Sequence, residues 1–224
     1  FSQLLDMVAT AFPKMRFRFS TSNPQDMSLE VIHTMSKHPN ICKYIHLPIQ
    51  SGSTSVLKRM NRQHTREEYL ELIDAIKRII PECAISQDMI TGFCGETEEE
   101  HLDTLSLMEY VNYDFGFMFA YSERPGTLAA KKMPDDVPGD IKKRRLNEII
   151  RLQQQHSLIR MQQFVGKTVE VLIEGSSKKS ELHWKGRNSQ NAMVVFPKTN
   201  EKVGDLIHVY IEGCTSATLL GKKA

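Results

Sequence analysis

The sequence contains no run of about 18 consecutive apolar residues, so it offers no membrane-spanning helix. Its first residues, FSQLLDMVATAF, carry an acid and lack the basic start of a secretory signal. Cysteine is scarce and widely spaced: Cys42, Cys83, Cys94 and Cys214 form no C-x-x-C pair, which excludes a zinc knuckle and a local iron–sulfur nest. We therefore expect a reduced, cytoplasmic protein without a membrane partner.

Extremes of composition are absent too. Hydrophobic residues make up 40% and charged residues 25% of the chain, which excludes a disordered chain, a collagen-like repeat and a disulfide-rich mini-protein. A length of 224 residues suffices for one or two domains of about 100–200 residues each. The chain begins with Phe1 instead of Met, which suggests a piece of a longer polypeptide.

The net charge of +2 hides a gradient along the chain. Residues 1–130 hold 12 Lys and Arg against 17 Asp and Glu, whereas residues 131–164 hold 8 against 4 and residues 165–224 hold 9 against 6. A basic C-terminal part suggests a polyanion partner, usually nucleic acid. Charge alone is equally consistent with a well-solvated helix and a lysine-rich surface.

The first 130 residues alternate between strand-like and helix-like periodicity. We expect strands over 15–20, 42–47, 83–90 and 115–121. Helices are expected before Pro13, after a cap at Ser28, over 53–60, from a capping box at Thr65 to Ile80, and over 97–111. This alternation predicts a parallel sheet covered by helices, and about four strands make it part of a barrel or a small open sheet.

The alternation of expected strands and helices ends after residue 121. Two turn-rich segments, SERPGT and MPDDVPGD, precede a long helix expected over 141–164, which begins with the basic run Lys142–Arg145. Gly166 marks a boundary, and five short alternating strands follow it, which predicts a small β-barrel. We therefore expect two domains, 1–164 and 165–224.

Polar residues follow each of the four expected strands, in the segments STSNP, HLPIQSGS, DMITGFCGE and YSERPGT. Ligands of parallel α/β sheets gather beyond the carboxyl ends of the strands. The Thr21 hydroxyl, the Gln50 amide and the Asp88 carboxylate would suit a polar ligand with a ribose. Ordinary strand-end turns are the alternative for any single segment, but four in succession favour a site.

These segments carry a resemblance to a known family. HLPIQSGS, MNRQHTREEY, SQDMITGFCGETEEE and FAYSERPGT resemble the second half of a radical S-adenosylmethionine methylthiotransferase of the MiaB type. The closing segment, from VGKTVEVLIEG to NAMVVFP, resembles the family's TRAM domain, a small RNA-binding barrel. The resemblance covers essentially the whole chain. It implies an α/β fold, part of a radical SAM (β/α) barrel, followed by a small all-β, OB-like TRAM barrel.

The family also implies parts that this sequence lacks. Its members begin with a domain whose cysteines hold an auxiliary cluster, and their barrel starts with a C-x-x-x-C-x-x-C motif that ligates the cluster cleaving S-adenosylmethionine. Neither set is present here, so two 4Fe-4S clusters would be ligated outside this chain, by the N-terminal part of the same enzyme. We expect no metal ligand and no catalytic residue in this chain, and expect the chain alone to be inactive and monomeric.

Several positions match cofactor positions of the family. By resemblance, S-adenosylmethionine would be held through its ribose, methionine and adenine portions; the expected residues are Thr21, Gln50, Arg62, Asp88, Ile90 and Gly92. Arg62 suits a two-pronged contact with the methionine carboxylate. The alternatives are a surface arginine for Arg62 and a plain core residue for Ile90.

The expected partner of the basic part is the anticodon stem-loop of a tRNA. Tyr121 and Arg124 are expected on the strand nearest the RNA-binding barrel, where they would contact the target nucleotide, unless they form a structural loop. In the barrel, basic residues interleaved with the aromatics Trp184 and Phe196 suit RNA. The expected RNA contacts in the barrel are Lys178, Lys179, Lys185, Arg187 and Asn191. The basic run Lys142–Arg145, on the helix before the barrel, is the alternative RNA-binding segment.

The resemblance implies methylthiolation of N6-isopentenyladenosine beside the tRNA anticodon. One S-adenosylmethionine would methylate a cluster sulfur, and another would yield a 5′-deoxyadenosyl radical that abstracts hydrogen from the adenine carbon. Two alternatives stay open at this point. One is a sister methylthiotransferase acting on threonylcarbamoyladenosine or a ribosomal protein, and the other is a non-catalytic RNA-binding module.

Overall fold

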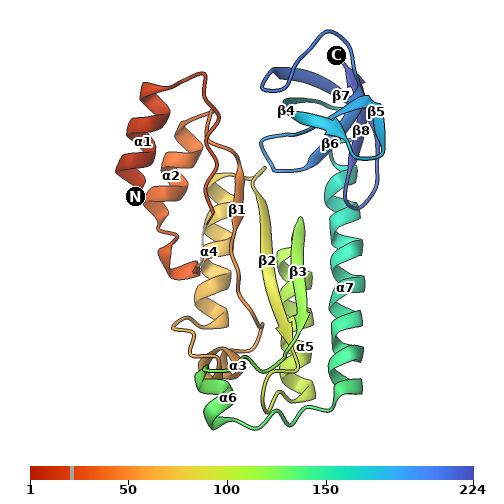
Figure 1. Cartoon of the computed structure of the whole chain (residues 1–224). Helices are drawn as coiled ribbons and strands as arrows, with labels where there is room; N and C mark the ends of the chain where they lie inside the picture. Colours follow the sequence, from red (N-terminus) through yellow and green to blue (C-terminus); the bar gives the residue numbers. More distant parts are fainter. Residues whose placement is uncertain (21–22) are drawn as a thin grey trace.

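A three-stranded parallel sheet and a closed barrel form the two centres of the computed structural model, which describes residues 1–20 and 23–224 (Figure 1). The strands of the sheet are β1 (Tyr44–His46), β2 (Ala84–Thr91) and β3 (Phe115–Ala120). The helices are α1 (Ser2–Ala11), α2 (Leu29–Lys37), α3 (Thr54–Arg59), α4 (Arg66–Ile79), α5 (Glu98–Val111), α6 (Leu128–Lys132) and α7 (Gly139–Gln162), with a 3₁₀ turn over Pro24–Asp26. The expected alternation of strands and helices is confirmed.

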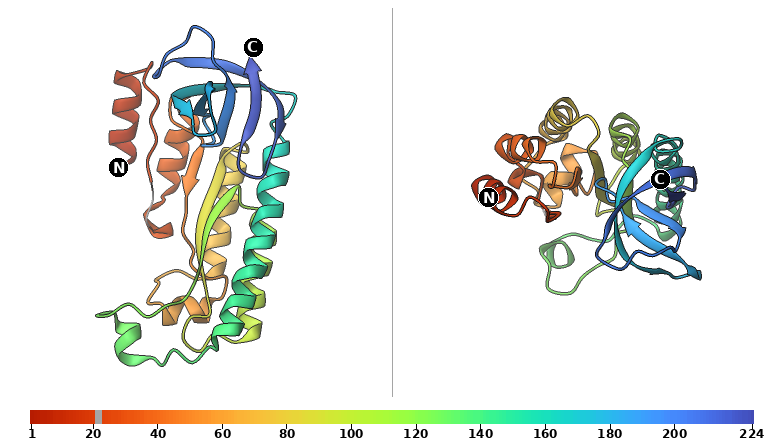
Figure 2. Two further views of the ribbon diagram at one scale, coloured as in Figure 1. Left: turned by 45° about the vertical axis from the view of Figure 1, so that its right-hand side comes forward. Right: turned by 90° about the horizontal axis from the view of Figure 1, so that it is seen from above.

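An arc of helices covers one face of the sheet (Figure 2). Ile45 of β1 and Met89 of β2 are fully buried, and Ile73 and Ile76 of α4 pack into the same core. The opposite face is left open along β3, where alternate residues are exposed. The parallel register places the carboxyl ends of the strands at one edge, as expected for a partial barrel.

Capping boxes start the two helices that follow the polar loops. The Thr65 hydroxyl accepts from the Glu68 amide and the Glu68 carboxylate accepts from the Thr65 amide, as expected from the sequence. Thr97 and Glu100 make the same reciprocal pair. A capping side chain is worth about 1 kcal/mol. These caps define where the loops end, and so they help to hold the loops at the sheet edge.

The strand expected over residues 15–20 is wrong. Only Phe17 pairs with its neighbour, through a single parallel bridge to Ile41. The alternating side chains still divide between two sides: Phe17 and Phe19 pack against the core, whereas Arg16 and Arg18 donate to backbone carbonyls of the C-terminal barrel. The segment therefore connects the two parts of the chain and adds only that one bridge to the sheet.

Helix α7 turns an unusually polar face inward. Apart from Ile149, its buried residues are Lys142, Arg145, Gln153, His156 and Ser157. Gln153 donates to the Tyr113 carbonyl at 3.0 Å and Ser157 donates to the Asp114 carbonyl at 2.8 Å, just before β3. Polar side chains are buried here because they satisfy backbone groups beside this strand.

The barrel consists of β4 (Thr168–Ser177), β5 (Ser180–Arg187), β6 (Met193–Pro197), β7 (Leu206–Cys214) and β8 (Leu219–Lys223), closed in the order β4-β5-β6-β8-β7. Val171, Val194, Val209 and Ile211 fill its interior without measurable exposure. Phe196 is only 1% exposed in the same core, so its expected part in an RNA-binding surface is wrong.

The barrel joins the sheet at the edge opposite the polar loops (Figure 1). Helix α7 begins beside Tyr121, whose carbonyl accepts from Lys142, and ends beside Asp114, which pairs with Arg160 at 2.8 Å. The 18 residues between these contacts span about 27 Å at about 1.5 Å per residue. The expectation that Tyr121 and Arg124 lie nearest the barrel is therefore wrong, because α7 runs back along β3 before the barrel begins.

None of the helices in the described residues combines the length and the apolar character needed to cross a bilayer.

Candidate cofactor and RNA-binding sites

A cavity of about 810 Å³ opens at the carboxyl ends of the strands. It brings together most of the residues that we expected at a cofactor site and two that we expected at RNA. Those that line it are Gln50, Arg62, Asp88, Ile90, Tyr121 and Arg124. The volume lies within the range of about 300–1,000 Å³ that is typical of small-molecule sites.

Gln50 is held at the cavity by an unusual backbone. Its amide donates to the Asp88 carbonyl at 2.9 Å, and its carbonyl accepts from the Ile90 amide at 2.8 Å. Its φ is 78°, in the left-handed region that costs a non-glycine residue free energy. Strained positions of this kind cluster at ligand sites, which favours a binding role for Gln50 over that of an ordinary turn residue.

Asp88 lies on β2 and has a side chain that is 30% exposed. The nearest ring nitrogen of His46, Nε2, lies 3.5 Å from Asp88 Oδ2. The other ring nitrogen of His46 lies 2.8 Å from Ser86 Oγ, which orients the imidazole. The Asp88 carboxylate therefore keeps acceptor capacity toward the cavity, where it can accept hydrogen bonds from hydroxyl groups.

Arg62 and Arg59 both line the cavity, but their guanidinium groups differ. Arg59 is neutralised by Glu100, at 2.6 Å between Nη2 and Oε2. Within the described part of the chain, the Arg62 guanidinium has no hydrogen-bond or ion-pair partner. Burial lowers the pKa of Arg62, and the negative charge of Asp88 opposes this shift. A half-buried cation without a partner at a cavity wall suits an anionic ligand group such as a carboxylate.

The remaining residues expected to bind the cofactor are Ile90, Gly92 and Thr21. Ile90 lines the cavity and is partly exposed. Gly92 does not line it: a Cβ there would lie 2.4 Å from Lys142 Cγ, so the glycine allows α7 to pack closely. The Gly92 amide donates to Glu96 at 2.8 Å. Thr21 lies outside the described residues.

Tyr121 and Arg124 lie at the mouth of the cavity. The Tyr121 ring packs edge-on against Phe93 at 4.9 Å, and the Lys142 ammonium lies 5.2 Å from its centre. Burial raises the pKa of Tyr121 to about 12. Sequence reasoning missed Lys58 and Lys132, which also line this cavity and carry exposed positive charge. Their proximity in sequence to MNR and YSERPGT was the available signal.

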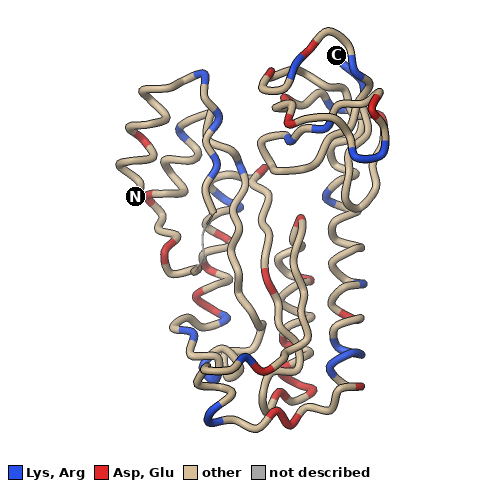
Figure 3. Tube along the Cα trace, viewed as in Figure 1, with Lys and Arg blue, Asp and Glu red and all other residues tan. Residues whose placement is uncertain are grey.

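In the barrel, the expected RNA contacts divide into two places. Lys178 and Lys179 form the exposed turn between β4 and β5, and Lys185 lies on β5; all three lack an acidic partner in the described residues. The barrel's basic residues also stand out in Figure 3. Arg187 pairs with Glu174 at 2.8 Å, and both Arg187 and Asn191 line a second cavity. The side chains therefore do not form one continuous surface.

A further cation of the barrel was not foreseen from the sequence. The Lys198 ammonium lies 4.3 Å from the centre of the Trp184 ring and donates to Ser176 at 2.8 Å. Trp184 is partly exposed, with the cation over its face. The position of Lys198 directly after the β6 strand was the only sequence signal, because the contact depends on strand pairing between β5 and β6.

The basic run at the start of α7 is largely structural. Arg145 is 4% exposed and pairs with Glu96, and Lys142 is 8% exposed and pairs with Asp135. Arg144 forms ion pairs with Glu98 and Glu148. Lys143 alone among the four is exposed and without an ion pair in the described structure. The run Lys142–Arg145 is therefore poorly suited to bind RNA.

The family implies two kinds of cofactor. The residues of the cavity fit S-adenosylmethionine, whereas the cysteines do not fit an iron–sulfur cluster. Arg62, Asp88 and Gln50 fit S-adenosylmethionine, because they offer a guanidinium group, a carboxylate and an amide to one cavity. The four cysteines are unpaired and three of them are buried. Among residues 1–20 and 23–224, no three His, Cys, Asp or Glu side chains come together as a metal site. The residues present do not fit a cluster.

Comparison with known families finds two matches in the chain. Residues 2–108 match the Radical SAM superfamily, and residues 162–224 match the TRAM domain. The chain is 63% identical to the tRNA-2-methylthio-N(6)-dimethylallyladenosine synthase of Flavobacterium johnsoniae over 222 residues, which is 99% of this chain and 46% of that protein.

Proteins of the same name show similar coverage in other organisms. The identity is 57% for Amoebophilus asiaticus, over 99% of this chain and 46% of the relative. It is 52% for Bacteroides thetaiotaomicron, over 100% and 49% respectively. The chain spans about half the length of these curated relatives. The resemblance inferred from the sequence is confirmed: the chain contains a radical SAM region followed by a TRAM domain.

Proposed function

We propose, from a radical SAM region joined to a TRAM domain, that this chain is the C-terminal part of a tRNA methylthiotransferase. The substrate in this proposal is N6-isopentenyladenosine beside the anticodon, which gains a methylthio group. Relatives that cover 99% or more of this chain carry a name for that activity. The activity belongs to the longer enzyme, of which this chain would supply part of the cofactor pocket and the tRNA contacts.

The observation that carries the proposal is the Arg62 guanidinium, which has no partner among residues 1–20 and 23–224 and lines the cavity that also contains Asp88 and Gln50. An arginine can bind a carboxylate through two parallel hydrogen bonds. A carboxylate and an amide can bind the two hydroxyls of a ribose. Such a set of groups matches a nucleoside that carries an amino-acid group, and S-adenosylmethionine is one.

In this proposal, each residue orients one portion of the cofactor. Arg62 holds the methionine carboxylate, Asp88 and Gln50 hold the ribose, and Ile90 contacts the adenine. When bound, S-adenosylmethionine supplies the methyl group and one-electron chemistry. His46 stabilises the Asp88 carboxylate in position, because its ring is itself held by Ser86. Among the described residues, no three His, Cys, Asp or Glu side chains come together to hold an iron–sulfur cluster, so in this proposal the clusters are ligated by another part of the enzyme.

The tRNA contacts in this proposal come from both ends of α7. Lys58, Arg124 and Lys132 place positive charge around the mouth of the cofactor cavity. Lys178 and Lys179 place positive charge on the barrel, about a helix length away. A rigid, elongated partner such as an RNA stem-loop can contact two separated basic sites, and phosphate contacts would supply most of the affinity.

Nucleoside analysis of tRNA tests this proposal. A strain that lacks the gene encoding this chain should accumulate N6-isopentenyladenosine and lose its 2-methylthio derivative. Mass spectrometry of digested tRNA measures both. Complementation with the intact gene should restore the modification, whereas an otherwise identical gene with Arg62→Gln should restore much less. Arg78→Gln, on the exposed side of α4, is the matched control.

The alternatives give different results in the same experiment. Loss of methylthio groups from threonylcarbamoyladenosine or from a ribosomal protein would identify a sister enzyme. Unchanged nucleosides and ribosomal proteins, together with retained RNA binding, would identify a non-catalytic RNA-binding module.

A further inference from the structure

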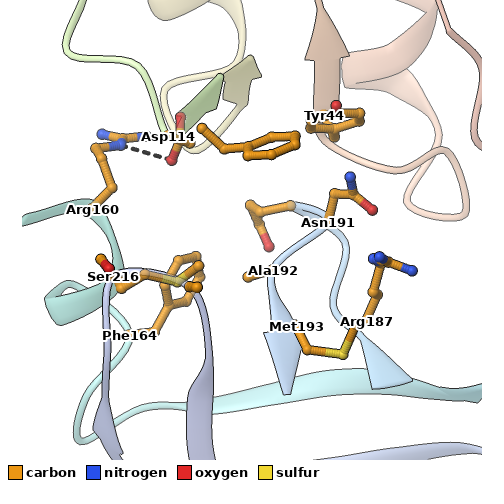
Figure 4. Close-up of a pocket in the computed structure, with 13 residues that line it drawn as sticks. Tyr44, Asp114, Arg160, Phe164, Arg187, Asn191, Ala192, Met193 and Ser216 are labelled. Carbon is orange, nitrogen blue, oxygen red and sulfur yellow. Dashed lines mark hydrogen bonds and ion pairs between the residues drawn. The ribbon is translucent and has the colours of Figure 1, made fainter. Parts of the chain in front are cut away.

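A second cavity, of about 320 Å³, lies between the sheet and the barrel (Figure 4). The amino ends of β1 and β3 contribute Tyr44 and Phe115, and the segment that follows α7 contributes Phe164. The barrel contributes the loop between β5 and β6, including Gln190 and Asn191. This cavity is separate from the one that contains Arg62 and Asp88, since α7 runs between the two ends of the sheet.

The walls of this cavity include three aromatic side chains and two side-chain amides. Tyr44, Phe115 and Phe164 present aromatic surfaces, and the Tyr44 hydroxyl lies 2.7 Å from Ser86 Oγ, which orients its ring. In the described structure, the side-chain amides of Gln190 and Asn191 make no hydrogen bond. By contrast, the Asp114 carboxylate is already satisfied by Arg160 and by the Ile85 amide, each at 2.8 Å.

The loop that carries these amides is fixed to the sheet. Ser189 Oγ accepts from the Lys43 amide at 2.9 Å, and the Asn188 carbonyl accepts from Arg18 at 3.2 Å. Within the loop, the Asn188 side chain accepts from the Ala192 amide at 2.9 Å. These contacts hold the backbone of the loop in place relative to Arg18 and Lys43 before any ligand binds, which reduces the entropy cost of ordering the loop on binding.

We propose that this cavity binds one unpaired base of the RNA partner. Aromatic rings bind bases by stacking, and side-chain amides bind their polar edges. Arg187 also lines the cavity; its guanidinium is paired with Glu174 at 2.8 Å, but its side chain is 37% exposed, so its remaining N–H groups can contact an adjoining phosphate. Lys185 and the Lys178–Lys179 turn lie on the same hairpin, so a strand leaving the cavity meets positive charge. The inference rests on the proposed function, because it takes the partner to be RNA.

Two variants of the present chain test the cavity directly. Ala217 is exposed and lines the cavity, so Ala217→Trp fills the space without entering the barrel core. Asn191 has φ 66°, so Asn191→Gly removes the amide and keeps the backbone conformation. Circular dichroism melting shows whether each variant folds. Should Ala217→Trp fail to fold, Asn191→Gly preserves the test.

The probe is an anticodon stem-loop RNA, together with a series in which one loop nucleotide at a time is abasic. Fluorescence anisotropy measures each dissociation constant. One abasic position should weaken binding to the unmodified chain by roughly five- to a hundredfold, the amount expected when a stacked base is removed. Ala217→Trp should weaken binding of intact RNA by a similar factor and be insensitive to that abasic position. Asn191→Gly should partly reduce the loss of affinity that this abasic position causes.

The double change Lys178→Ala with Lys179→Ala is the control. It should weaken every RNA of the series alike and leave the sensitivity to the abasic position intact. Equal binding of all abasic RNAs, or full sensitivity retained in both cavity variants, would overturn the base site while leaving RNA binding in place. Failure of the unmodified chain to bind any stem-loop would instead overturn the tRNA partner itself, and this inference with it.

Discussion

Arg145 of α7 and Glu96 of the loop before α5 form an ion pair at 2.8 Å, with side chains only 5% and 1% exposed. Burial raises the pKa of Glu96, while the Gly92 amide and the charge of Arg145 oppose that shift. The pair joins α7 to the loop that follows β2. It gives a structural role to a residue that the sequence alone made a candidate for RNA binding.

Removing this arginine should destabilise the fold. Arg145→Met leaves the Glu96 carboxyl buried without its cation, and the loss of one partner of a buried pair costs about 3–5 kcal/mol. Urea unfolding measures the change. Lys143→Met, an exposed change in the same basic run, should alter the free energy of unfolding by less than about 0.5 kcal/mol. Equal stability of the two variants would show that the pair contributes nothing.

Stability should fall in acid partly through Glu100. Burial raises the pKa of Glu100, but hydrogen bonds from Arg59, Ser55 and the Thr97 amide lower it to about 2, against an ordinary value of 4.5. Between these values the unfolded chain binds more protons than the folded chain, so this contribution is complete above pH 4.5 and lost as pH falls toward 2.

The variant Glu100→Gln checks that window. Its free energy of unfolding should be lower than that of the unmodified chain at pH 7, and the difference should shrink as pH falls from 4.5 to 2. Glu123→Gln, at an exposed position without an ion pair in the described structure, is the control. A difference that stays constant with pH would disprove the assignment.

Cofactor affinity should depend on Asp88 and Gln50. In the full-length enzyme, Asp88→Asn removes a charged acceptor, and Gln50→Gly removes the amide while tolerating the left-handed backbone. Loss of one hydrogen bond to a charged or polar ligand is worth about 1.5–3 kcal/mol, or roughly ten- to a hundredfold in affinity. Calorimetric titration with S-adenosylmethionine measures this. Unchanged affinity in both variants would make these residues ordinary turn residues.

RNA binding should be electrostatic at the barrel. Changing Lys178 and Lys179 to Ala should weaken binding of an anticodon stem-loop and reduce the log–log salt slope by about 0.7–0.9 for each phosphate that the variant no longer neutralises. Changing Lys143 and Arg144 together removes the same charge from α7 and should leave the slope nearly unchanged, because Arg144 is already paired. A slope altered only by the helix variant would place the RNA grip on α7.

The isolated chain should not assemble a four-iron cluster. Such a cluster needs three nearby thiolates, and the cysteines of this chain are far apart in sequence. After anaerobic reconstitution, iron and sulfide should stay well below stoichiometric amounts. Four equivalents of each with the matching absorbance would contradict this prediction.

The sequence by itself determined the order of the elements and the polar loops that follow the strands. Thr65 and Thr97 marked helix starts correctly, because capping depends on residues within one turn. The five strands of the barrel were equally legible, because alternation of apolar and polar residues is a local property. Gln50, Arg62 and Asp88 met at one cavity because parallel strands end at the same edge of their sheet.

Which basic side chains form buried ion pairs could be learned only from the tertiary structure. Arg145 and Lys142 looked solvated in the sequence, but both are buried in ion pairs, Arg145 with the distant Glu96 and Lys142 with the nearby Asp135. Residues 15–20 had a strand pattern, yet their arginines contact the barrel and only Phe17 pairs. The cavity between Tyr44 and Asn191 could not be foreseen, since its walls come from segments more than a hundred residues apart. Such contacts depend on how α7 returns along β3, and no local periodicity encodes that path.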